Sequence, residues 1–253
     1  MNDFEGRAVL VTGAAGGIGA AAARQFAERG ANVALADRSS CTDTLAAISA
    51  AGGTAIAIEV DVADDESIAA MIATTIERFG RLDAAFNNAG VNERQARFHE
   101  ADLAEFERVI AINLRGVYLC MRHEIAAMLA DEPAADRAIV NTSSGAGVVA
   151  APGNPAYTAA KHAVLGLTKL AAAEYARDRI RVNAILPGPT DTPMLRASMD
   201  ANPGMEQFLT KVLPQGRLGT ADEVAEAAVW LCSPAATYVS GVSLLVDGGQ
   251  VNR

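Results

Sequence analysis

The chain has 253 residues, 51% of them hydrophobic, and a formal net charge of −9. This size and composition suit one large α/β domain with a sizeable core, so we expect residues 1–253 to form a single domain. No basic run and no aromatic–basic interleaving occurs, so nucleic acid is not an expected partner. No apolar run approaches the ~20 residues that cross a bilayer, so no membrane association is expected.

Cysteine and histidine usage indicates a cytoplasmic protein without a metal site. The cysteines are odd in number and form no CxxC pair, which predicts buried, reduced thiols at Cys41, Cys120 and Cys232. The three histidines match neither HExxH nor another metal-ligand pattern, so no bound metal is expected.

The first predicted element is a short apolar run, Ala8–Thr12, which has no helical period and is typical of a strand buried on both faces. A glycine-rich turn follows at once, and an Ala-rich helix is predicted over Gly17–Arg29. Glycine lets the backbone turn tightly and lets a ligand approach, while a helix N-terminus offers free N–H groups. An ordinary tight turn is the alternative to the pyrophosphate site that we predict at Gly13, Gly17, Ile18 and Gly19.

An acidic residue, Asp37, ends the next strand-like run, Asn32–Asp37. It lies at about the ~20-residue distance expected of a carboxylate that binds the adenosine ribose of a dinucleotide. Such a carboxylate accepts hydrogen bonds from the ribose hydroxyls and repels a 2′-phosphate. Arg38 argues the other way, because an arginine there can bind that phosphate. We therefore predict dinucleotide binding, with NAD favoured over NADP.

Further along the chain, strand-like runs alternate with longer helical patterns. This alternation predicts a parallel sheet with helices on both faces, and no repeat or linker interrupts it. The remaining strands are expected at Thr54–Val60, Ala84–Asn87, Ala138–Thr142, Arg181–Leu186 and Ser243–Val246. The remaining helices are expected at Asp43–Ala51, Asp64–Phe79, Asp102–Leu129, Pro155–Arg177 and Ala221–Leu231.

Several polar residues and glycines follow these strands at their carboxyl ends, where open α/β sheets bind ligands. Taken singly, helix capping would explain Asp61, and an ordinary turn would explain Asn88 and Gly90. Together with the glycine turn they favour a cofactor crevice. The positions that we expect to line this crevice are Asp61, Val62, Asn88, Gly90, Pro187, Gly188, Thr190 and Thr192.

The block from Asn141 to Ala176 holds the candidate catalytic side chains. Ser144 ends the fifth strand, and Tyr157 and Lys161 are four residues apart, which puts them on one face of the next helix. A Tyr–Lys pair at this spacing is also common on exposed helix surfaces. Because this helix begins beside the end of a crevice strand, we expect the pair near the glycine turn.

Between residues 191 and 215 the periodic pattern degrades, and apolar side chains are scattered among Pro203, Gly204 and Pro214. The position of this segment after a crevice strand predicts a mobile helical flap over a small-molecule site. A surface excursion that packs on its own domain is the alternative. The polar stretch Asn92–Arg97 either lines the mouth of the site or is a solvated loop.

Taken together, these motifs resemble the classical short-chain dehydrogenase/reductase family over essentially the whole chain. The matching motifs are TGAAGGIG at Thr12–Gly19, NNAG at Asn87–Gly90, Asn113 in the INL run, Ser144, the YxxxK of Tyr157 and Lys161, and PG at Pro187 and Gly188. The spacing from Ser144 to Tyr157 also fits the family. The resemblance implies a Rossmann-type, doubly wound, seven-stranded parallel sheet, a nicotinamide cofactor and usually a homotetramer.

The resemblance also implies a role for each matched side chain. Tyr157 would be the general acid/base, assisted by the ammonium of Lys161, because a free phenol titrates near pH ~10. Both residues would also contact the cofactor, and Lys161 would bind the ribose hydroxyls of that cofactor. Ser144 would hydrogen-bond the substrate oxygen. Asn113 would hold a water that relays protons to Lys161, and the alternative is a solvent-facing helix residue.

The sequence therefore predicts an NAD(H)-dependent oxidoreductase that interconverts a secondary alcohol and a ketone, with a cyclic, apolar substrate suggested by the flap. A 3-oxoacyl carrier-protein reductase that uses NADPH is the alternative, but Asp37 and the net negative charge oppose it. A non-catalytic dinucleotide sensor is disfavoured by the complete catalytic set. The helices expected at Asp102–Leu129 and Pro155–Arg177 are long, and the small alanine side chains of the second permit close symmetric pairing, which favours a homotetramer.

Overall fold

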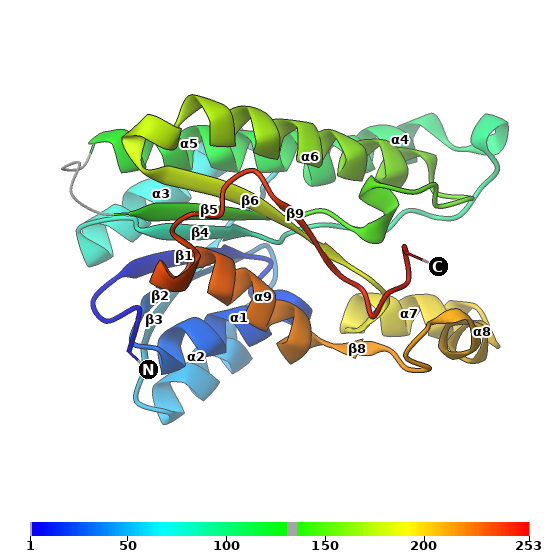
Figure 1. Cartoon of the computed structure of the whole chain (residues 1–253), viewed down its shortest axis with the longest axis horizontal. Helices are drawn as coiled ribbons and strands as arrows, with labels where there is room; N and C mark the ends of the chain where they lie inside the picture. The colour runs from blue at the N-terminus through cyan, green and yellow to red at the C-terminus, as the bar shows by residue number, and fades with distance from the viewer. Residues whose placement is uncertain (1, 131–135, 253) are drawn as a thin grey trace.

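The computed structural model describes residues 2–130 and 136–252. Its main sheet has seven parallel strands in the order β3-β2-β1-β4-β5-β6-β9 (Figure 1). The chain starts in the middle, builds one half outward, returns to the centre and builds the other half, so the predicted doubly wound fold is confirmed. The strands are β1 (Ala8–Thr12), β2 (Asn32–Asp37), β3 (Thr54–Glu59), β4 (Ala84–Asn87), β5 (Arg137–Thr142), β6 (Ile180–Pro187) and β9 (Ser243–Val246).

Helices cover both faces of the sheet (Figure 1). Side chains alternate along each strand, so Val9 and Val11 pack with α1, α2 and α9, while Leu10 packs with α3, α5 and α6. The helix α4 lies against α6. The helices named here are α1 (Gly17–Glu28), α2 (Thr42–Ala50), α3 (Asp65–Phe79), α4 (Leu103–Ile110), α5 (Val117–Ala130), α6 (Pro155–Glu174) and α9 (Ala221–Cys232).

The prediction of a single long helix over Asp102–Leu129 is wrong in one respect. A π-helical turn, Ala111–Gly116, separates α4 from α5. Two contacts accompany it: the Asn113 side chain points inward to the backbone of Val91, and Gly116 approaches the carbonyl oxygen of Val62 so closely that a Cβ would lie 2.9 Å from it. Such π-turns are frequent at functional sites.

The segment after β6 is more ordered than the sequence pattern indicates. It contains two helices, α7 (Pro193–Ala201) and α8 (Met205–Val212), and a two-stranded parallel ribbon of β7 (Thr190–Asp191) and β8 (Gly219–Thr220). The helical nature of the predicted flap agrees with this, while its mobility stays a prediction. The sequence pattern missed the ribbon because a strand of two residues has no detectable alternation.

Other boundaries shift by a few residues. The helix expected over Pro155–Arg177 ends at Glu174, where the chain enters a 3₁₀ turn and Arg179 takes a left-handed φ of 59°. Within residues 2–130 and 136–252, no helix combines the length and the hydropathy needed to cross a bilayer. The 3₁₀ turns lie at Phe98–Glu100, Gly145–Gly147, Ala176–Asp178 and Pro234–Ala236.

Candidate active site

The glycine turn joins β1 to α1 and has no room for a side chain at Gly13 or Gly19. Gly13 and Gly17 have φ values of +70° and +55°. A Cβ at Gly19 would lie 2.1 Å from the carbonyl oxygen of Gly13, and one at Gly13 would lie 2.8 Å from Nδ2 of Asn88. No side chain caps the N-terminus of α1, which leaves its first N–H groups to the turn. Ile18 is half-buried against the core on this face of the sheet. The turn therefore fits a pyrophosphate.

Asp37 is tied to this turn. Its carboxylate accepts hydrogen bonds from the backbone N–H of Ala15 at 3.0 Å and of Ser39 at 2.8 Å. The Thr44 hydroxyl donates to the carbonyl of Ala14 at 2.9 Å and holds the other side of the turn. Because an ionised carboxylate has about four acceptor positions, Asp37 retains capacity for two ribose hydroxyls. These residues fit the adenosine half of a dinucleotide.

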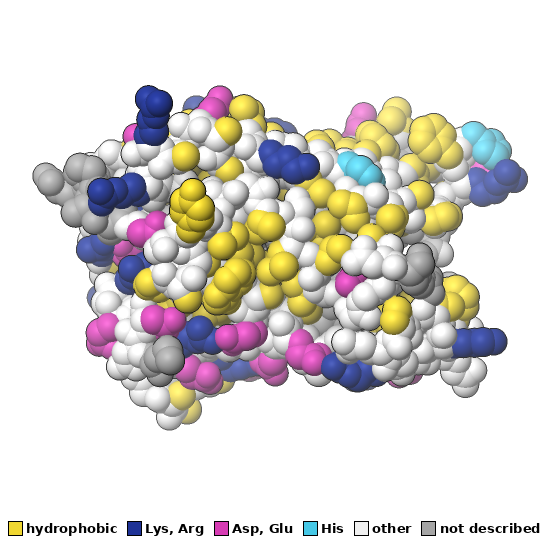
Figure 2. Space-filling model, viewed as in Figure 1, with side chains coloured by type: hydrophobic (Ala, Val, Ile, Leu, Met, Phe, Trp, Pro, Cys, Tyr) yellow, Lys and Arg dark blue, Asp and Glu magenta, His cyan; other side chains and the backbone are white. Residues whose placement is uncertain are grey.

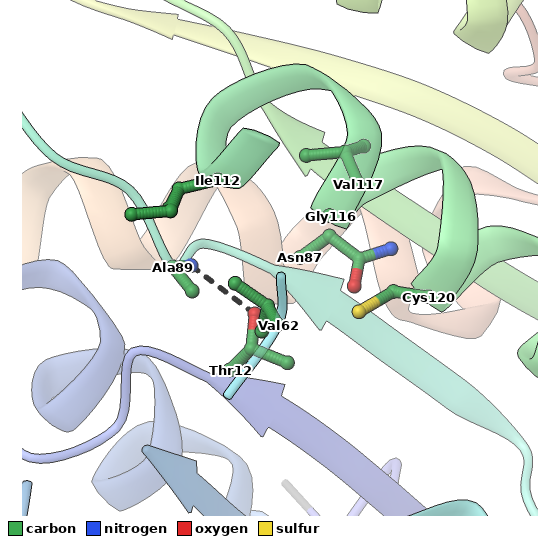
Figure 3. Close-up of a pocket in the computed structure, with 8 residues that line it drawn as sticks. All are labelled: Thr12, Val62, Asn87, Ala89, Ile112, Gly116, Val117 and Cys120. Atoms are coloured by element: carbon green, nitrogen blue, oxygen red, sulfur yellow. Dashed lines mark hydrogen bonds between the residues drawn. The ribbon is translucent and has the colours of Figure 1, made fainter. Parts of the chain in front are cut away.

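A small pocket joins the ends of β1 and β4 to the π-turn (Figure 3). The Thr12 hydroxyl oxygen accepts the N–H groups of Asn88 at 3.0 Å and Ala89 at 3.1 Å, so the NNAG segment is fixed to β1. Asp61 bonds locally to the N–H of Ala63, and its predicted contact with a cofactor stays a prediction. The pocket is lined by Thr12, Val62, Asn87, Ala89, Ile112, Gly116, Val117 and Cys120.

Lys161 is buried, with only 3% of its surface exposed. Its ammonium donates to the carbonyl oxygen of Thr142 at 2.8 Å, and Nζ lies 5.4 Å from the centroid of the Tyr157 ring. Ser143, which precedes the predicted catalytic serine, donates its hydroxyl to the Lys161 carbonyl at 2.8 Å. Burial lowers the pKa of Lys161 to about 8. The helix α6 thus holds its lysine against the end of β5.

The hydroxyls of Tyr157 and Ser144 lie next to each other. Burial raises the pKa of the Tyr157 phenol, and the hydrogen-bonding influence of the Ser144 hydroxyl acts in the opposite direction. The Ser144 oxygen also accepts the N–H of Ala146 at 3.1 Å, which fixes its rotamer. Two adjacent hydroxyls can bind one substrate oxygen, and the Tyr157 side chain can give a proton to that oxygen as the phenol or take one from it as the phenolate.

Asn113 faces inward and is fully buried, so the solvent-facing alternative is wrong. Its Oδ1 accepts the N–H of Val91 and its Nδ2 donates to the Val91 carbonyl, both at 2.8 Å. A Cβ on Gly90 would lie 3.2 Å from Oδ1 of Asn113 and 3.8 Å from Nζ of Lys161. Gly90 therefore allows Asn113 to approach Lys161, while the water relay stays a prediction. We call Asn113, Ser144, Tyr157 and Lys161 the catalytic corner.

The segment after β6 reaches the glycine turn. A Cβ at Gly188 would lie 2.8 Å from Cα of Asp247, so the chain passes very close to the segment after β9. The Thr190 hydroxyl donates to the Gly188 carbonyl at 2.9 Å. Thr192 caps α7, and its Cγ2 is 3.3 Å from where a Cβ on Gly17 would lie. The predicted positions from Pro187 to Thr192 thus lie between the end of β6 and the turn.

The flap also contacts the loop after β4. Asn92 donates its side-chain N–H to the Ser198 hydroxyl of α7 at 3.2 Å. The next residue, Glu93, accepts the backbone N–H groups of Ala156 and Tyr157. From the sequence, the polar stretch Asn92–Arg97 is expected either to line the mouth of the site or to be a solvated loop. No sequence pattern indicates the contact between Glu93 and Tyr157, which are 64 residues apart.

A polar cluster lies buried on the α5 side of the sheet, next to the pocket. Nδ2 of Asn87 donates to Oε2 of Glu124 at 2.9 Å and to Oδ1 of Asn141 at 3.1 Å, and Asn141 donates to Thr168 at 3.0 Å. Burial raises the pKa of Glu124 to about 8. Sequence patterns missed this cluster because its members come from four separate elements. No group of three or more His, Cys, Asp or Glu side chains in the described ranges could hold a metal ion.

Comparison with known proteins agrees with this geometry. The family model described as enoyl-(acyl carrier protein) reductase matches residues 13–250. A 2,5-dichloro-2,5-cyclohexadiene-1,4-diol dehydrogenase from Sphingobium indicum is 43% identical over 98% of both chains. The chain belongs to the short-chain dehydrogenase/reductase family. A cis-4-hydroxycyclohexanecarboxylate dehydrogenase from Sinomonas cyclohexanicum is 45% identical over 97% of both chains.

Solved structures of this family share the fold closely. Levodione reductase superposes with a TM-score of 0.93 at 37% identity, covering 98% of this chain and 99% of that one. A 3-ketoacyl-(acyl-carrier-protein) reductase from Brucella melitensis, complexed with NADH, is 33% identical with a TM-score of 0.89 over 98% and 99% of the two chains. A dehydrogenase structure from Agrobacterium tumefaciens with bound NADP is 36% identical, with a TM-score of 0.89 over 100% and 99%. This family member is therefore an NAD(P)-dependent oxidoreductase that acts on hydroxyl groups.

Proposed function

We propose that this enzyme interconverts a secondary alcohol and a ketone with NAD(H), and that Tyr157 is its general acid/base. The observation that carries the proposal is the buried ammonium of Lys161, 5.4 Å from the centroid of the Tyr157 ring, with the Ser144 hydroxyl next to that of Tyr157. In oxidation the phenolate of Tyr157 takes the proton from the substrate hydroxyl. In reduction the phenol donates its proton to the ketone oxygen. The Ser144 hydroxyl donates a hydrogen bond to that oxygen and stabilises the charge that develops on it.

The bound nicotinamide supplies hydride transfer, which the side chains of this protein do not provide. Lys161 has two roles in this proposal. Its positive charge stabilises the phenolate of Tyr157, and its ammonium binds the cofactor ribose. The residues that we propose to hold the rest of the cofactor are Gly13, Gly17, Ile18, Gly19, Asp37, Asp61, Val62, Asn88, Gly90, Pro187, Gly188, Thr190 and Thr192.

The preference for NAD rests on Asp37. Its carboxylate lies at the end of β2 and hydrogen-bonds the glycine turn, so a 2′-phosphate on the adenosine ribose would meet a negative charge. The turn itself carries Ala14 and Ala15, which offer no positive charge to that phosphate. Arg38 is exposed and is the residue that would accept a phosphate if Asp37 were removed.

The substrate that we propose is a cyclic secondary alcohol or its ketone. The names of the two relatives from Sphingobium indicum and Sinomonas cyclohexanicum describe alcohols on six-membered rings, a cyclohexadienediol and a hydroxycyclohexanecarboxylate. Apolar side chains are exposed on the flap, where 43% of Met194 and 63% of Phe208 is open to solvent, and beside Ser144, where 44% of Val148 is open. An apolar ring fits such a surface better than an open polyol does.

The test is a panel assay that follows the formation of NADH or NADPH. Cyclohexanol, cis-4-hydroxycyclohexanecarboxylate and a cyclic diol are compared with an open-chain secondary alcohol of the same carbon number, each with NAD and with NADP. We expect turnover of cyclic alcohols with NAD. Turnover only with NADP would contradict the cofactor assignment, and no oxidation of any secondary alcohol would contradict the reaction itself.

A second candidate is a 3-oxoacyl carrier-protein reductase that uses NADPH. The description of the matching family model and the Brucella melitensis relative favour it. Asp37 disfavours NADPH, and the net charge of −9 is unfavourable for an acidic carrier protein. Reduction of a 3-oxoacyl thioester by NADPH, faster than that of any cyclic ketone by NADH, would replace the first proposal with this one.

We further propose a cytoplasmic, one-domain subunit that assembles into a homotetramer. Large apolar side chains are exposed on α4, α5 and α6, at Leu103, Tyr118 and Leu170. Figure 2 shows hydrophobic side chains gathered across the middle of the face that carries the edge strand β9. Symmetric pairing of such faces closes an oligomer. Light scattering should give four times the subunit mass of 26.1 kDa, and the mass of one subunit would contradict the assembly.

A further inference from the structure

The helix that carries Tyr157 and Lys161 is capped from a distance. Asn154, which precedes α6, makes no cap with its side chain and donates instead to the Pro152 carbonyl at 3.3 Å. The carboxylate of Glu93 takes its place: Oε2 accepts the N–H of Ala156 at 3.2 Å, and Oε1 accepts the N–H of Tyr157 at 2.9 Å. One of the two donors is therefore the backbone of the predicted acid/base.

This arrangement differs from the other helix caps among the described residues. The side-chain caps of α3, α4, α7 and α9 all come from a residue two or three positions from the N–H that they accept. Those caps stabilise their own helices and do not fix a helix relative to a distant segment of the chain. A carboxylate that binds two successive N–H groups from 63 and 64 residues away fixes the first turn of α6 relative to another segment.

The segment that carries Glu93 is itself firmly anchored. Asn113 binds both backbone groups of Val91, two residues earlier. The guanidinium of Arg108 on α4 donates to the Asn92 carbonyl at 2.8 Å and pairs with Glu105, which accepts the N–H of Arg94 at 3.1 Å. The residues on either side of Glu93 are thus held by α4 and the π-turn. The backbone from which the Glu93 side chain extends therefore has a fixed position.

We propose that Glu93 is a positioning residue of the reaction: by holding the N–H groups of Ala156 and Tyr157, it sets where the Tyr157 hydroxyl lies relative to Ser144. The proposal rests on the proposed role of Tyr157 as general acid/base. Proton transfer requires heavy-atom distances of roughly 2.6–3.2 Å, so a small displacement of the first turn of α6 lengthens a distance on which the rate depends. A misplacement of about 1 Å can cost about 100-fold in rate.

The test compares Glu93→Ala and Glu93→Gln with the wild type, using NAD and the best cyclic alcohol of the panel. Glu93→Ala removes both acceptors, and we expect kcat to fall by about 10- to 100-fold while KM for NAD stays within about twofold. Glu93→Gln keeps the length and one carbonyl oxygen, so it should recover a large part of kcat. Hydrogen–deuterium exchange should show lost protection at Ala156 and Tyr157 in Glu93→Ala, and this readout needs no activity.

The matched control is Glu223→Ala, because Glu223 also binds a backbone N–H at a helix start, that of Thr220 at 2.8 Å, but caps α9. It should lower the melting temperature and leave kcat unchanged, as a purely structural cap does. A folded Glu93→Ala protein with wild-type kcat, or with unchanged protection of both amides, would overturn the proposal. If Glu93→Ala does not fold, Glu93→Gln carries the same measurements, and wild-type kcat together with unchanged protection there overturns it.

A parallel Tyr157→Phe protein separates this proposal from the function on which it rests. Activity retained in Tyr157→Phe would remove the acid/base role and the positioning role together. An inactive Tyr157→Phe beside a fully active Glu93→Ala would overturn the positioning role alone.

Discussion

The glycine turn and the catalytic corner both lie at the carboxyl ends of the strands, yet the turn has no room for side chains at Gly13 and Gly19, whereas the corner buries polar side chains. At Gly13 and Gly19 a Cβ would meet neighbouring atoms at 2.8 Å and 2.1 Å, so the turn is shaped by the absence of side chains. In the catalytic corner, Asn113 and Lys161 are polar and almost fully buried, and backbone groups hold both side chains: two of Val91 for Asn113 and the Thr142 carbonyl for Lys161. The first region exposes backbone N–H groups, and the second withdraws titratable groups from water.

This difference has a consequence for the chemistry. Backbone N–H groups carry no pKa near neutrality, so the turn can bind an anion at any physiological pH. In the catalytic corner, burial lowers the pKa of Lys161 to about 8 and raises that of Tyr157. The proposed function of the corner therefore depends on proton occupancy, whereas the proposed cofactor binding at the turn depends on shape.

The largest effect should come from the corner itself. Tyr157→Phe keeps the ring packing and removes only the hydroxyl that we propose to transfer the proton. General acid–base groups typically contribute ~10²–10⁴-fold, so kcat should fall by about that factor while NADH still binds. Steady-state rates and NADH titration measure the two quantities separately.

Lys161→Ala is the informative companion to this variant. Because Lys161 is assigned both to the phenolate and to the ribose, the substitution should lower kcat and weaken NAD binding together. Activity near wild type in Tyr157→Phe would mean that another group moves the proton, and unchanged NAD affinity in Lys161→Ala would remove the ribose contact.

An intermediate effect should come from the turn region. Asp37→Ala removes the carboxylate that we propose to accept hydrogen bonds from the ribose hydroxyls. Such charged hydrogen bonds are worth ~1.5–3 kcal/mol, so NAD affinity should fall by roughly one to two factors of ten. NADP efficiency should rise at the same time, because the repulsion of its 2′-phosphate disappears and Arg38 can pair with it. The ratio of kcat/KM for NAD to that for NADP is the measurement, and an unchanged ratio would contradict the ribose contact of Asp37.

The sequence predicted one of these regions better than the other for physical reasons. A strand, a glycine turn and a helix are encoded by neighbouring residues, so Ala8–Thr12 and the start of α1 at Gly17 agree with the structure. The predicted positions of the corner come together at one sheet edge, yet what holds them was not visible. The π-turn around Asn113 and the cap from Glu93 depend on partners 22 and 64 residues away.

The polar cluster behind the corner was invisible for the same reason. Glu124 lies in an ordinary helical pattern, and nothing local indicates that its carboxyl is fully buried beside Asn87. Its protonation follows from tertiary packing, which periodicity does not report.

Glu124→Gln should have the smallest effect on turnover. It should instead change how the free energy of unfolding depends on pH. Burial raises the pKa of Glu124 from 4.5 to about 8, so between these values the folded protein keeps a proton that the unfolded chain has lost. The free energy of unfolding therefore falls as the pH rises from about 4.5 to 8, by about 1.4 kcal/mol for each unit of the shift that is crossed. Glutamine is neutral throughout, so the variant should lose this slope.

Melting temperatures at pH 5 and pH 8 measure the slope directly. Wild type and Glu124→Gln should be close at pH 5 and diverge at pH 8, where the variant is the more stable, with kcat nearly unchanged. Glu223→Gln is the control: its partner Arg217 lowers the pKa of Glu223 to about 2, below both conditions, so its loss should shift both melting temperatures alike. If the melting temperatures of wild type and Glu124→Gln change by the same amount between pH 5 and pH 8, Glu124 does not hold its proton in the folded state. The contrast between a buried, proton-dependent corner and a shape-dependent turn would then end at Lys161 and Tyr157 rather than extend into the sheet behind them.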